Sequence, residues 1–187
     1  MLNENIISSI QNLIIKLNKQ GDSIEGSIEC GIFGIKPGIG SPIFDKIESY
    51  IADLIFAIPA VKALEFGSGF KSSKLTGFEN NDSFFINKNG LIKTKTNNHG
   101  GVLGGISSSM PIIFKVAFKP TPTVFKLQKT IDLKNLVEKK IKFSGQHDSC
   151  IVFRGVAVVE AVANIANVSQ ILNQGKLKVG GLVDWKF

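Results

Sequence analysis

Apolar residues recur every three or four positions near the start of the chain, with Asn, Gln and Lys between them. This spacing predicts an amphipathic helix whose apolar stripe forms a wall of the core. The stripe consists of Ile6, Ile7, Ile10, Leu13, Ile14 and Leu17. The alternation that follows, from Ser27 to Ile35, predicts a strand.

A second helix is expected after the glycine turn at residues 38–40. Ser41 suits an N-cap and Pro42 suits the first helical position, where its missing N–H costs nothing. Pro59 ends this helix. Its buried stripe would be Ile43, Phe44, Ile47, Ile51, Leu54 and Ile55.

The rest of the chain mixes strands with one more long helix. The segments expected to form strands are 61–66, 111–118 and 123–128, and a helix is expected around 156–171. Residues 71–95 are rich in Lys, Ser and Asn, which predicts an exposed excursion with a weak hairpin at Asn89-Gly90. A lysine-rich connection is expected at 129–142, and a loosely packed tail after Gly175. The mixture predicts an α+β fold and not a doubly wound sheet.

Composition narrows the class of protein. The chain has 187 residues, enough for a single domain over 1–187, and a net charge of +7. Arg154 is its only arginine, and the lysines are dispersed, which argues against nucleic-acid binding. A basic balance does suit an anionic small-molecule substrate.

Three further features bear on location and cofactors. Cys30 and Cys150 are too few for a disulfide framework, and no His/Cys cluster has metal-ligand spacing, so we expect reduced thiols and no metal. Residues 1–20 match no signal peptide. Arg154 and Glu160 interrupt the longest apolar stretch, so we expect no membrane span and a cytoplasmic protein.

The segment 96–123 holds the most informative local pattern. Four glycines (Gly100, Gly101, Gly104 and Gly105) permit close backbone approach to a ligand, and three serines follow them. Lys119 then ends an apolar strand and is held by Pro120, where a cation can bind an anion. The alternative is a purely structural role, because glycine loops and Pro-Thr-Pro-Thr turns commonly just connect helices and strands. The segment also lacks the Gly-Lys-Ser/Thr ending of a P-loop.

Several blocks in order resemble chorismate synthase. They are Pro37-Gly-Ile-Gly-Ser-Pro-Ile-Phe-Asp45, Ile58-Pro-Ala-Val-Lys-Ala-Leu-Glu-Phe-Gly-Ser-Gly-Phe70, the segment 96–123, Gly145-Gln-His-Asp-Ser-Cys150 and Arg154-Gly-Val-Ala-Val-Val-Glu-Ala161. The resemblance runs from about Gly21 to Leu172. It implies the elimination of phosphate from 5-enolpyruvylshikimate 3-phosphate to give chorismate on reduced FMN, with NADPH as a candidate flavin reductant.

The resemblance also implies an architecture. The family fold is a β-α-β sandwich of antiparallel sheets enclosing long helices, built by duplication and assembled as a homotetramer. The family chain is roughly twice as long, and its Ser-His-Gly motif and second catalytic histidine lie in the half that has no counterpart here. We therefore expect a carboxy-terminal half, one lobe of the duplicated fold: a truncated product, an excised fragment, or one piece of a split enzyme with a complementary amino-terminal chain.

The resemblance assigns FMN contacts in four places. Their local chemistry fits that role, since it offers close backbone approach, one cation and two hydroxyls. The residues are Pro59, Ala60, Gly104, Lys119, Pro120, Thr121, Pro122, Thr123 and Gln146. Gln146 stands where the family has an arginine, which predicts weaker flavin binding.

Catalysis is assigned to the loop that contains Asp148 and His147. A carboxylate beside an imidazole can relay a proton, and the family pattern places its catalytic aspartate at Asp148; from these residues alone a surface turn is the alternative. Arg154 matches a family arginine that could bind substrate anions. An ion pair with Glu160 or another acid is the alternative for Arg154. A non-catalytic remnant or partner subunit that binds flavin weakly or not at all is the competing function.

Overall fold

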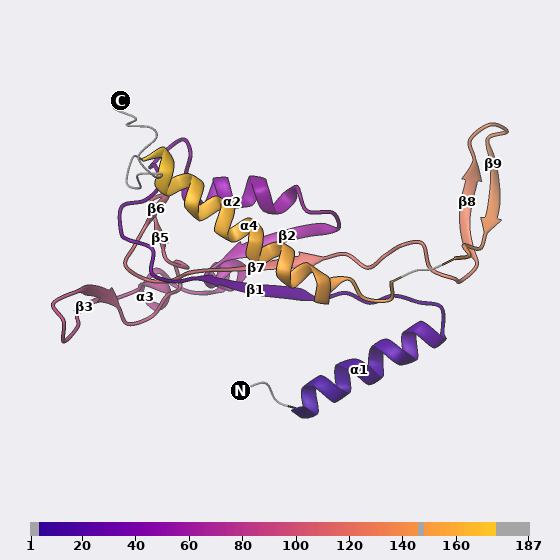
Figure 1. Ribbon diagram of the computed structural model, residues 1–187, viewed down its shortest axis with the longest axis horizontal. Coiled ribbons are helices and arrows are strands. Elements are labelled where there is room, and N and C mark those ends of the chain that lie inside the picture. Colours follow the sequence, from indigo (N-terminus) through magenta and orange to yellow (C-terminus); the bar gives the residue numbers. More distant parts are fainter. Residues whose placement is uncertain (1–3, 146–147, 175–187) are drawn as a thin grey trace, which may run out of the picture. The chain divides into compact units, whose positions relative to one another are not determined.

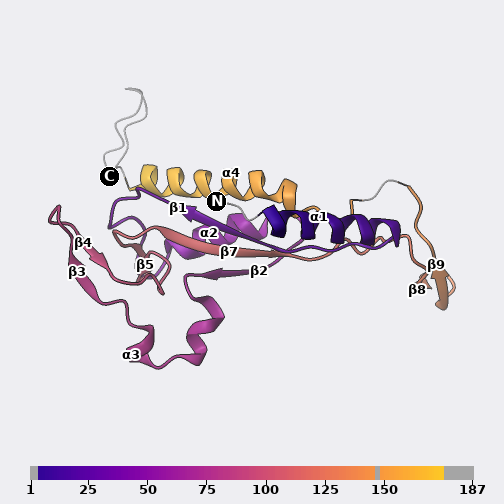
Figure 2. The ribbon, with the colours of Figure 1, turned by 90° about the horizontal axis from the view of Figure 1, so that it is seen from below.

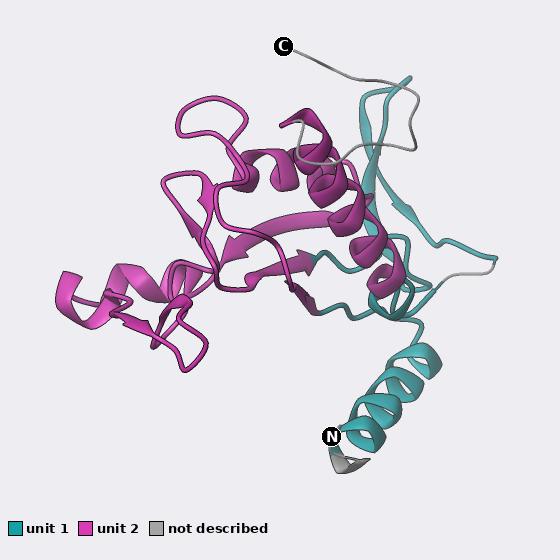
Figure 3. Ribbon diagram, turned by 60° about the vertical axis from the view of Figure 1, so that its left-hand side comes forward, with its two compact units in different colours: residues 1–26, 118–154 teal, residues 27–117, 155–187 magenta. Residues whose placement is uncertain are grey.

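The computed structural model describes residues 4–145 and 148–174. Figure 3 shows the chain divided into two compact units: unit 1 comprises residues 1–26 and 118–154, and unit 2 comprises residues 27–117 and 155–187. Each unit is described by itself below. The expectation of one domain over 1–187 stays a prediction, because this division does not test which part folds alone.

Unit 2 is built on a three-stranded sheet in the order β1-β7-β2 (Figure 1). The strands are β1 (Ser27–Ile32), β2 (Val61–Phe66) and β7 (Ile112–Phe118), and β1 pairs antiparallel with β7. Every second residue of β7 is buried, which leaves its other side chains on an open face. On that open face the Lys115 Nζ lies 3.7 Å from a carboxylate oxygen of Glu29 and 3.9 Å from one of Glu65. These two ion pairs link β7 to both of its neighbouring strands.

Two helices cover the buried face of this sheet: α2 (Ile47–Phe56) and α4 (Val152–Asn173), as Figures 1 and 2 show. The α2 side chains buried in the core are Ile47, Ile51 and Ile55. Phe114 of β7 is 1% exposed, and its ring lies 5.7 Å from that of Phe66. The core of unit 2 is therefore one sheet face packed against one helical layer.

The predicted start of the second helix is wrong. α2 begins at Ile47, and Ile43 and Phe44, expected in its buried stripe, are 71% and 80% exposed. Asp45 has φ +57°, which a right-handed helix does not admit. The amide of Ile47 donates instead to the carbonyl of Gly105 at 3.1 Å, so the glycine loop decides where the helix begins.

The excursion at 71–95 contains more structure than the composition suggested. It holds a 3₁₀ helix η1 (Gly69–Lys74), α3 (Gly77–Asn80) and the hairpin of β3 (Phe84–Ile86) with β4 (Ile92–Thr94). The hairpin around Asn89-Gly90 is confirmed. A capping box begins α3: the Thr76 hydroxyl accepts from the Glu79 amide at 3.3 Å, and the Glu79 carboxylate accepts from the Thr76 amide at 2.8 Å. A second pair, β5 (Val102–Leu103) with β6 (Ile106–Ser107), follows the excursion.

Unit 1 contains the predicted opening helix, α1 (Glu4–Lys19), and a hairpin of β8 (Gln128–Asp132) with β9 (Val137–Ile141). Two expectations fail here. The apolar stripe of α1 is not a core wall, since Ile6 is 57% exposed and Leu13 is 43% exposed. The lysine-rich segment 129–142, expected to be a connection, forms most of the hairpin, and of the expected strand 123–128 only Gln128 lies in a strand.

The α+β class is confirmed by these mixed elements and antiparallel pairings. Among the described residues one helix, α4, is long and apolar enough to cross a membrane, with 28% of that window buried. Length and composition alone give this result. One side of α4 packs within unit 2.

Candidate functional site

Residues 21–26 of unit 1 form hydrogen bonds with the Lys119–Thr123 segment and its flanks. The Ser23 hydroxyl donates to the Thr121 carbonyl at 2.7 Å. The amide of Phe118 donates to the carbonyl of Gly26 at 3.0 Å, and the amide of Phe125 donates to the carbonyl of Gly21 at 2.9 Å. Because Pro120 and Pro122 lack N–H groups, these bonds replace a strand ladder. They explain why residues 123–127 form no strand.

The same residues 21–26 also hold the segment that begins α4. The amide of Ile24 donates to the carbonyl of Ser149 at 2.9 Å. The Glu25 carboxylate accepts from the amide of Ile151 at 2.7 Å and from the amide of Val152 at 2.9 Å. These amides belong to the residue before α4 and to its first residue, where N–H groups lack intrahelical partners, so Glu25 caps α4. Unit 1 therefore brings the segments 118–125 and 148–154 to one short stretch of chain.

The segment matched to the flavin loop presents its side chains to solvent. Lys119, Pro120, Pro122 and Thr123 are exposed, and Thr121 is half-buried. Among residues 4–145 and 148–174, Lys119 has no ion pair within 4.0 Å. The segment thus offers an exposed cation on a backbone that hydrogen bonds hold in place.

Asp148 and Arg154 form an ion pair through a carboxylate oxygen and a guanidinium nitrogen. Their side chains are 44% and 75% exposed, respectively. The acid that pairs with Arg154 is therefore Asp148 and not Glu160. An exposed pair of this kind contributes little to stability, so it can open for a ligand. Gln146 and His147 lie outside the described residues.

In unit 2, Pro59 and Ala60 form the turn between α2 and β2. Ala60 has φ +71°, a left-handed conformation that is uncommon for a residue with a side chain. Pro59 is exposed and Ala60 is half-buried. Strained backbone of this kind is concentrated at functional sites, although the strain alone does not define one.

The glycines of segment 96–111 divide into packed and open positions. A Cβ on Gly101 would lie 2.2 Å from the carbonyl oxygen of Pro111, and one on Gly100 would lie 2.4 Å from the amide nitrogen of Gly67. A Cβ on Gly105 would lie 2.4 Å from the carbonyl oxygen of Ser41. Gly104 differs, because it is exposed, has φ +61° and would have nothing within 4 Å of an added Cβ. Three of the glycines are thus required by packing, and Gly104 is free to face a ligand.

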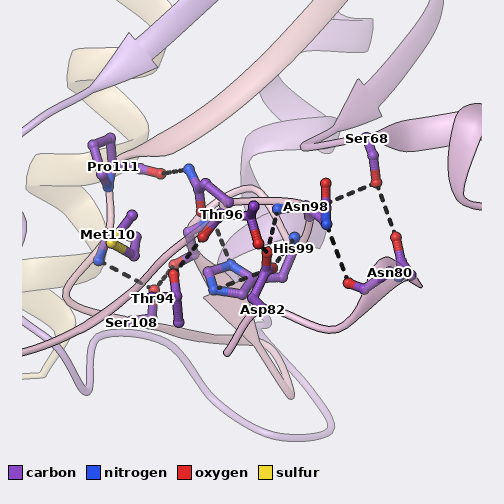
Figure 4. Close-up of polar contacts among 12 residues, drawn as sticks. Ser68, Asn80, Asp82, Thr94, Thr96, Asn98, His99, Ser108, Met110 and Pro111 are labelled. Atoms are coloured by element: carbon purple, nitrogen blue, oxygen red, sulfur yellow. Dashed lines mark hydrogen bonds and ion pairs between the residues drawn. The ribbon is translucent and has the colours of Figure 1, made fainter. Parts of the chain in front are cut away.

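A buried carboxylate, Asp82, organises the start of this loop (Figure 4). It accepts hydrogen bonds from the Thr96 hydroxyl, from the amide of Asn98 at 2.9 Å and from the amide of His99 at 2.8 Å. Burial acts to raise the pKa of Asp82, but these three hydrogen bonds outweigh the effect of burial, and the net shift of the pKa is downward. Asp82 therefore holds the loop as a charged acceptor.

His99 has a single tautomer compatible with its contacts. Its Nδ1 accepts from the amide of Gly101 at 2.8 Å, so the proton belongs on Nε2, which lies 3.7 Å from an Asp82 oxygen.

Asn97 accepts from the amide of Gly101 at 2.9 Å and donates to the carbonyl of Pro111 at 2.9 Å. Asn97 therefore holds the turn in place. Asp82 itself was missed, because nothing in the excursion marks it as buried.

A cavity of about 300 Å³ lies beside this network. Its lining residues are Gly77, Asn80, Asn81, Asp82, Phe84, His99 and Leu103. None of the candidate site residues lines it. In residues 4–145 and 148–174, no group of three or more His, Cys, Asp or Glu side chains could hold a metal ion, and both cysteines are free. Burial raises the pKa of both thiols, which keeps them protonated at neutral pH.

The antiparallel pairings and helices define an α+β protein that carries a glycine-rich loop in unit 2 and an exposed lysine-bearing loop in unit 1. Comparison with known proteins gives the family. The family model for chorismate synthase matches residues 1–172, and the chain belongs to the chorismate synthase family.

Named relatives support this membership. The chorismate synthase of Korarchaeum cryptofilum is 48% identical over 149 residues, which is 80% of this chain and 41% of that protein. The chorismate synthase of Thermococcus gammatolerans is 43% identical over 159 residues, 85% of this chain and 44% of that one. A crystal structure of chorismate synthase superposes with a TM-score of 0.71 at 26% identity, covering 89% of this chain and 43% of that chain. The chain thus spans less than half the length of these relatives.

Proposed function

We propose that the chain contributes to the chorismate synthase reaction, the 1,4-anti elimination of phosphate from 5-enolpyruvylshikimate 3-phosphate, with reduced FMN as cofactor. One observation carries the proposal: residues 21–26 bind both the segment with Lys119–Thr123 and the segment with Asp148 and Arg154. Both segments contain residues that match the family's flavin and substrate positions, and both belong to unit 1.

The residues present fit a flavin phosphate and ring. Lys119 supplies an exposed cation without an ion pair in the described part of the chain, and Thr121 and Thr123 supply hydroxyls. Gly104 leaves its backbone open to close approach. The resemblance also implies FMN contacts at Pro59 and Ala60 of unit 2 and, separately, at Pro120, Pro122 and Gln146 of unit 1.

The chain's own residues would act on charge and protons. Reduced FMN, held by the residues named above, would supply reversible electron donation to the breaking carbon–oxygen bond. Arg154 would orient a substrate anion once its ion pair with Asp148 opens. Asp148, helped by His147, would accept and pass on the ring proton. Lysine charge near the loop would stabilise the departing phosphate.

A second candidate is a non-catalytic chain that binds flavin weakly or serves as a partner subunit. Two observations favour it. Gln146 stands where the family has an arginine, so a neutral contact replaces a charge-assisted one. Asp148 and Arg154 are engaged with each other.

The remaining proposals concern the setting of the reaction. We place the protein in the cytoplasm, as a homo-oligomer such as the family's tetramer or with a complementary amino-terminal chain. NADPH would serve as the flavin reductant. Membership of the chorismate synthase family relates the chain to lyases of aromatic amino acid biosynthesis.

A flavin titration tests the binding part of the proposal. Lys119→Ala should weaken binding of reduced FMN by about 1.5 to 3 kcal/mol, the value of a hydrogen bond to a charged group. Lys95→Ala is the matched control, because Lys95 is an exposed lysine on the excursion. Equal effects of the two substitutions would show that the flavin is not seated at the loop.

An anaerobic assay with photoreduced FMN tests the catalytic part. We expect the isolated chain not to release phosphate from 5-enolpyruvylshikimate 3-phosphate, because it carries no Ser-His-Gly motif. Addition of the part of the Korarchaeum relative that lies outside the match should restore release. Turnover by the isolated chain at the rate of a full-length relative would refute the need for that part, and binding without turnover in either case would support the second candidate.

A further inference from the structure

The cavity beside Asp82 is separate from the residues assigned to flavin and substrate. It has a volume of about 300 Å³ and is formed within unit 2 by residues between Gly77 and Leu103. Small-molecule sites range from about 300 to 1,000 Å³, so this volume suits a small organic ligand. The polar groups that line the cavity indicate which kind of ligand it can hold.

Asp82 brings to the cavity a negative charge without a cationic partner. Its side chain is 6% exposed, and its lowered pKa keeps the carboxylate ionised at neutral pH. Within residues 4–145 and 148–174, no lysine or arginine nitrogen lies within 4.0 Å of this carboxylate. Its Oδ2 accepts from the amide of His99, and a carboxylate oxygen has room for a second donor. A buried charge in this state favours a cationic group on the ligand.

His99 brings a hydrogen-bond donor without an acceptor. Its side chain is 10% exposed, and its Nδ1 accepts from the amide of Gly101, which puts the proton on Nε2. Nε2 is buried and has no hydrogen-bond partner in the described part of the chain. The Asp82 oxygen beside it, drawn in Figure 4, is 3.7 Å away, which is too far for a hydrogen bond. Because buried donors are normally paired, this N–H group calls for an acceptor on a ligand.

Two asparagines add further donors to the lining. Asn80 accepts from the Ser68 hydroxyl through its Oδ1 at 3.3 Å, and its NH₂ group has no acceptor among the described residues. The exposed side chain of Asn81 has no hydrogen-bond partner among them either. The cavity therefore presents one anionic acceptor and three donors.

We propose that this cavity binds a free α-amino acid with an apolar side chain. The α-ammonium group would lie against Asp82, and the α-carboxylate would accept from Nε2 of His99 and from the asparagine NH₂ groups. Asp82 Oδ2 and His99 Nε2 are 3.7 Å apart, so they can hold two charged groups that a single α-carbon carries. A zwitterion thus meets both the unpaired charge and the unpaired donor.

Ligands with only one of these charged groups fit less well. An amine without a carboxylate would leave the His99 donor unpaired, and a buried unpaired donor is costly. A carboxylic acid without an ammonium group would place its charge beside the Asp82 carboxylate, and like charges repel.

The apolar part of the lining sets the preference for the ligand's side chain. Phe84 and Leu103 line the cavity and are 64% and 42% exposed. An aromatic ring can pack in an offset or edge-to-face arrangement on Phe84, so we expect aromatic amino acids to bind more tightly than small ones. The proposal is independent of flavin binding and of the proposed reaction, because none of the residues assigned to them lines the cavity.

Calorimetric titration of the full chain with L-phenylalanine tests the proposal. We expect saturable binding with a dissociation constant on the order of 1 mM or below, as for a ligand of this size. Two compounds of similar shape serve as comparisons: 2-phenylethylamine lacks the carboxylate, and 3-phenylpropionate lacks the ammonium group. Each should bind at least about tenfold more weakly. No saturation up to about 10 mM L-phenylalanine, or equally tight binding of either compound, would overturn the proposal.

A pair of substitutions places the ligand at the cavity. Phe84→Ala should weaken binding of L-phenylalanine at least about threefold, because it removes an aromatic contact. Phe78→Ala is the matched control, since Phe78 also belongs to the excursion, is 92% exposed and does not line the cavity. Equal effects of the two substitutions would overturn the assignment to this cavity.

NMR of the imidazole groups tests the role of His99 directly. The chain has two histidines, His99 and His147, so a His147→Ala chain shows the signals of His99 alone. L-phenylalanine should shift the Nε2 proton signal of His99 downfield, because the proton gains an acceptor, whereas 2-phenylethylamine should not. Saturable binding of L-phenylalanine that leaves this signal unchanged would overturn the proposal.

Discussion

The carboxylate of Glu25 accepts a hydrogen bond of 2.9 Å from the backbone amide of Val152, 127 residues further along the chain. Together with its bond to Ile151, this contact caps α4 and fixes the chain between Asp148 and Arg154. A helix cap supplied from so far away couples the candidate substrate residues to the stretch that also holds the Lys119 segment. The position of the candidate site therefore depends on one carboxylate that takes no part in the chemistry.

Replacement of Glu25 should show this coupling. Glu25→Ala removes both acceptors from amides at the start of α4, and we expect a loss of about 1 to 2 kcal/mol in the free energy of unfolding, as for a lost N-cap. Urea denaturation followed by circular dichroism measures it. Glu138→Ala, on the exposed strand β9, is the control and should change the midpoint little.

Helix capping of this kind could not be predicted from the sequence. Local caps are recognised from residues within a few positions, whereas Glu25 and Val152 meet only after folding. The bounds of β2 were predicted because Pro59 and Gly67 delimit a short apolar run. The start of α2 was not, because the Ser41-Pro42 signal favours a helix and the glycine loop, through Gly105 and Ile47, overrides it.

Two glycines of the same loop should respond differently to alanine. In Gly101→Ala the new Cβ would lie 2.2 Å from the Pro111 carbonyl oxygen, so the loop must move, and we expect a loss of more than about 2 kcal/mol in stability. In Gly104→Ala the new Cβ would have nothing within 4 Å. Only the left-handed backbone, at φ +61°, disfavours alanine there, and we expect a loss of about 1 kcal/mol in stability.

The matched pair separates folding from ligand binding. Thermal unfolding should rank Gly101→Ala well below Gly104→Ala in melting temperature. A flavin titration of Gly104→Ala, which stays folded, should then show weakened FMN binding if its backbone faces the cofactor. Equal melting temperatures for the two variants would contradict the packing described for Gly101.

Asp82 should make stability depend on pH in the acid range. Burial acts to raise its pKa in the folded state, but hydrogen bonds from Thr96, Asn98 and His99 outweigh that effect and the folded pKa is lowered. A carboxyl with a lowered folded pKa contributes stability that is fully present above its unfolded pKa, about 3.9, and is lost as pH falls through the folded pKa.

Asp82→Asn removes this contribution at all pH values. At neutral pH the substitution should cost about 1.5 to 3 kcal/mol, because an amide group would face two backbone donors. The difference between wild type and variant should shrink as pH falls below about 4. Denaturation at several pH values measures this, with Asp53→Asn on the exposed side of α2 as control. A difference that stays constant down to about pH 2 would rule out the charged acceptor.

Arg154 should exchange its ion pair with Asp148 for a contact with the substrate when the substrate binds. Arg154→Ala breaks an exposed ion pair, so the free energy of unfolding should change by less than about 1 kcal/mol. Binding of a phosphate- and carboxylate-bearing substrate analogue should weaken by more than that if Arg154 contacts it. Isothermal titration compares this variant with Lys139→Ala, whose lysine pairs with Asp132 in the β8–β9 hairpin. Similar losses for both would reduce Arg154 to part of a diffuse positive surface.

Gln146 is the residue whose replacement should strengthen flavin binding. Arginine brings a permanent charge and five donors where glutamine offers a neutral amide, so Gln146→Arg should increase FMN affinity if the family's contact is made here. The gain should be smaller in combination with Lys119→Ala, because both substitutions act on the same ligand. It should also fade as salt increases, since screening weakens a charge contact.

Fluorescence titrations of FMN with the single and double variants, at several salt concentrations, measure all three effects. If Gln146→Arg leaves the affinity unchanged at every salt concentration, position 146 does not face the cofactor, and the flavin assignment then depends on Lys119 and Gly104 alone.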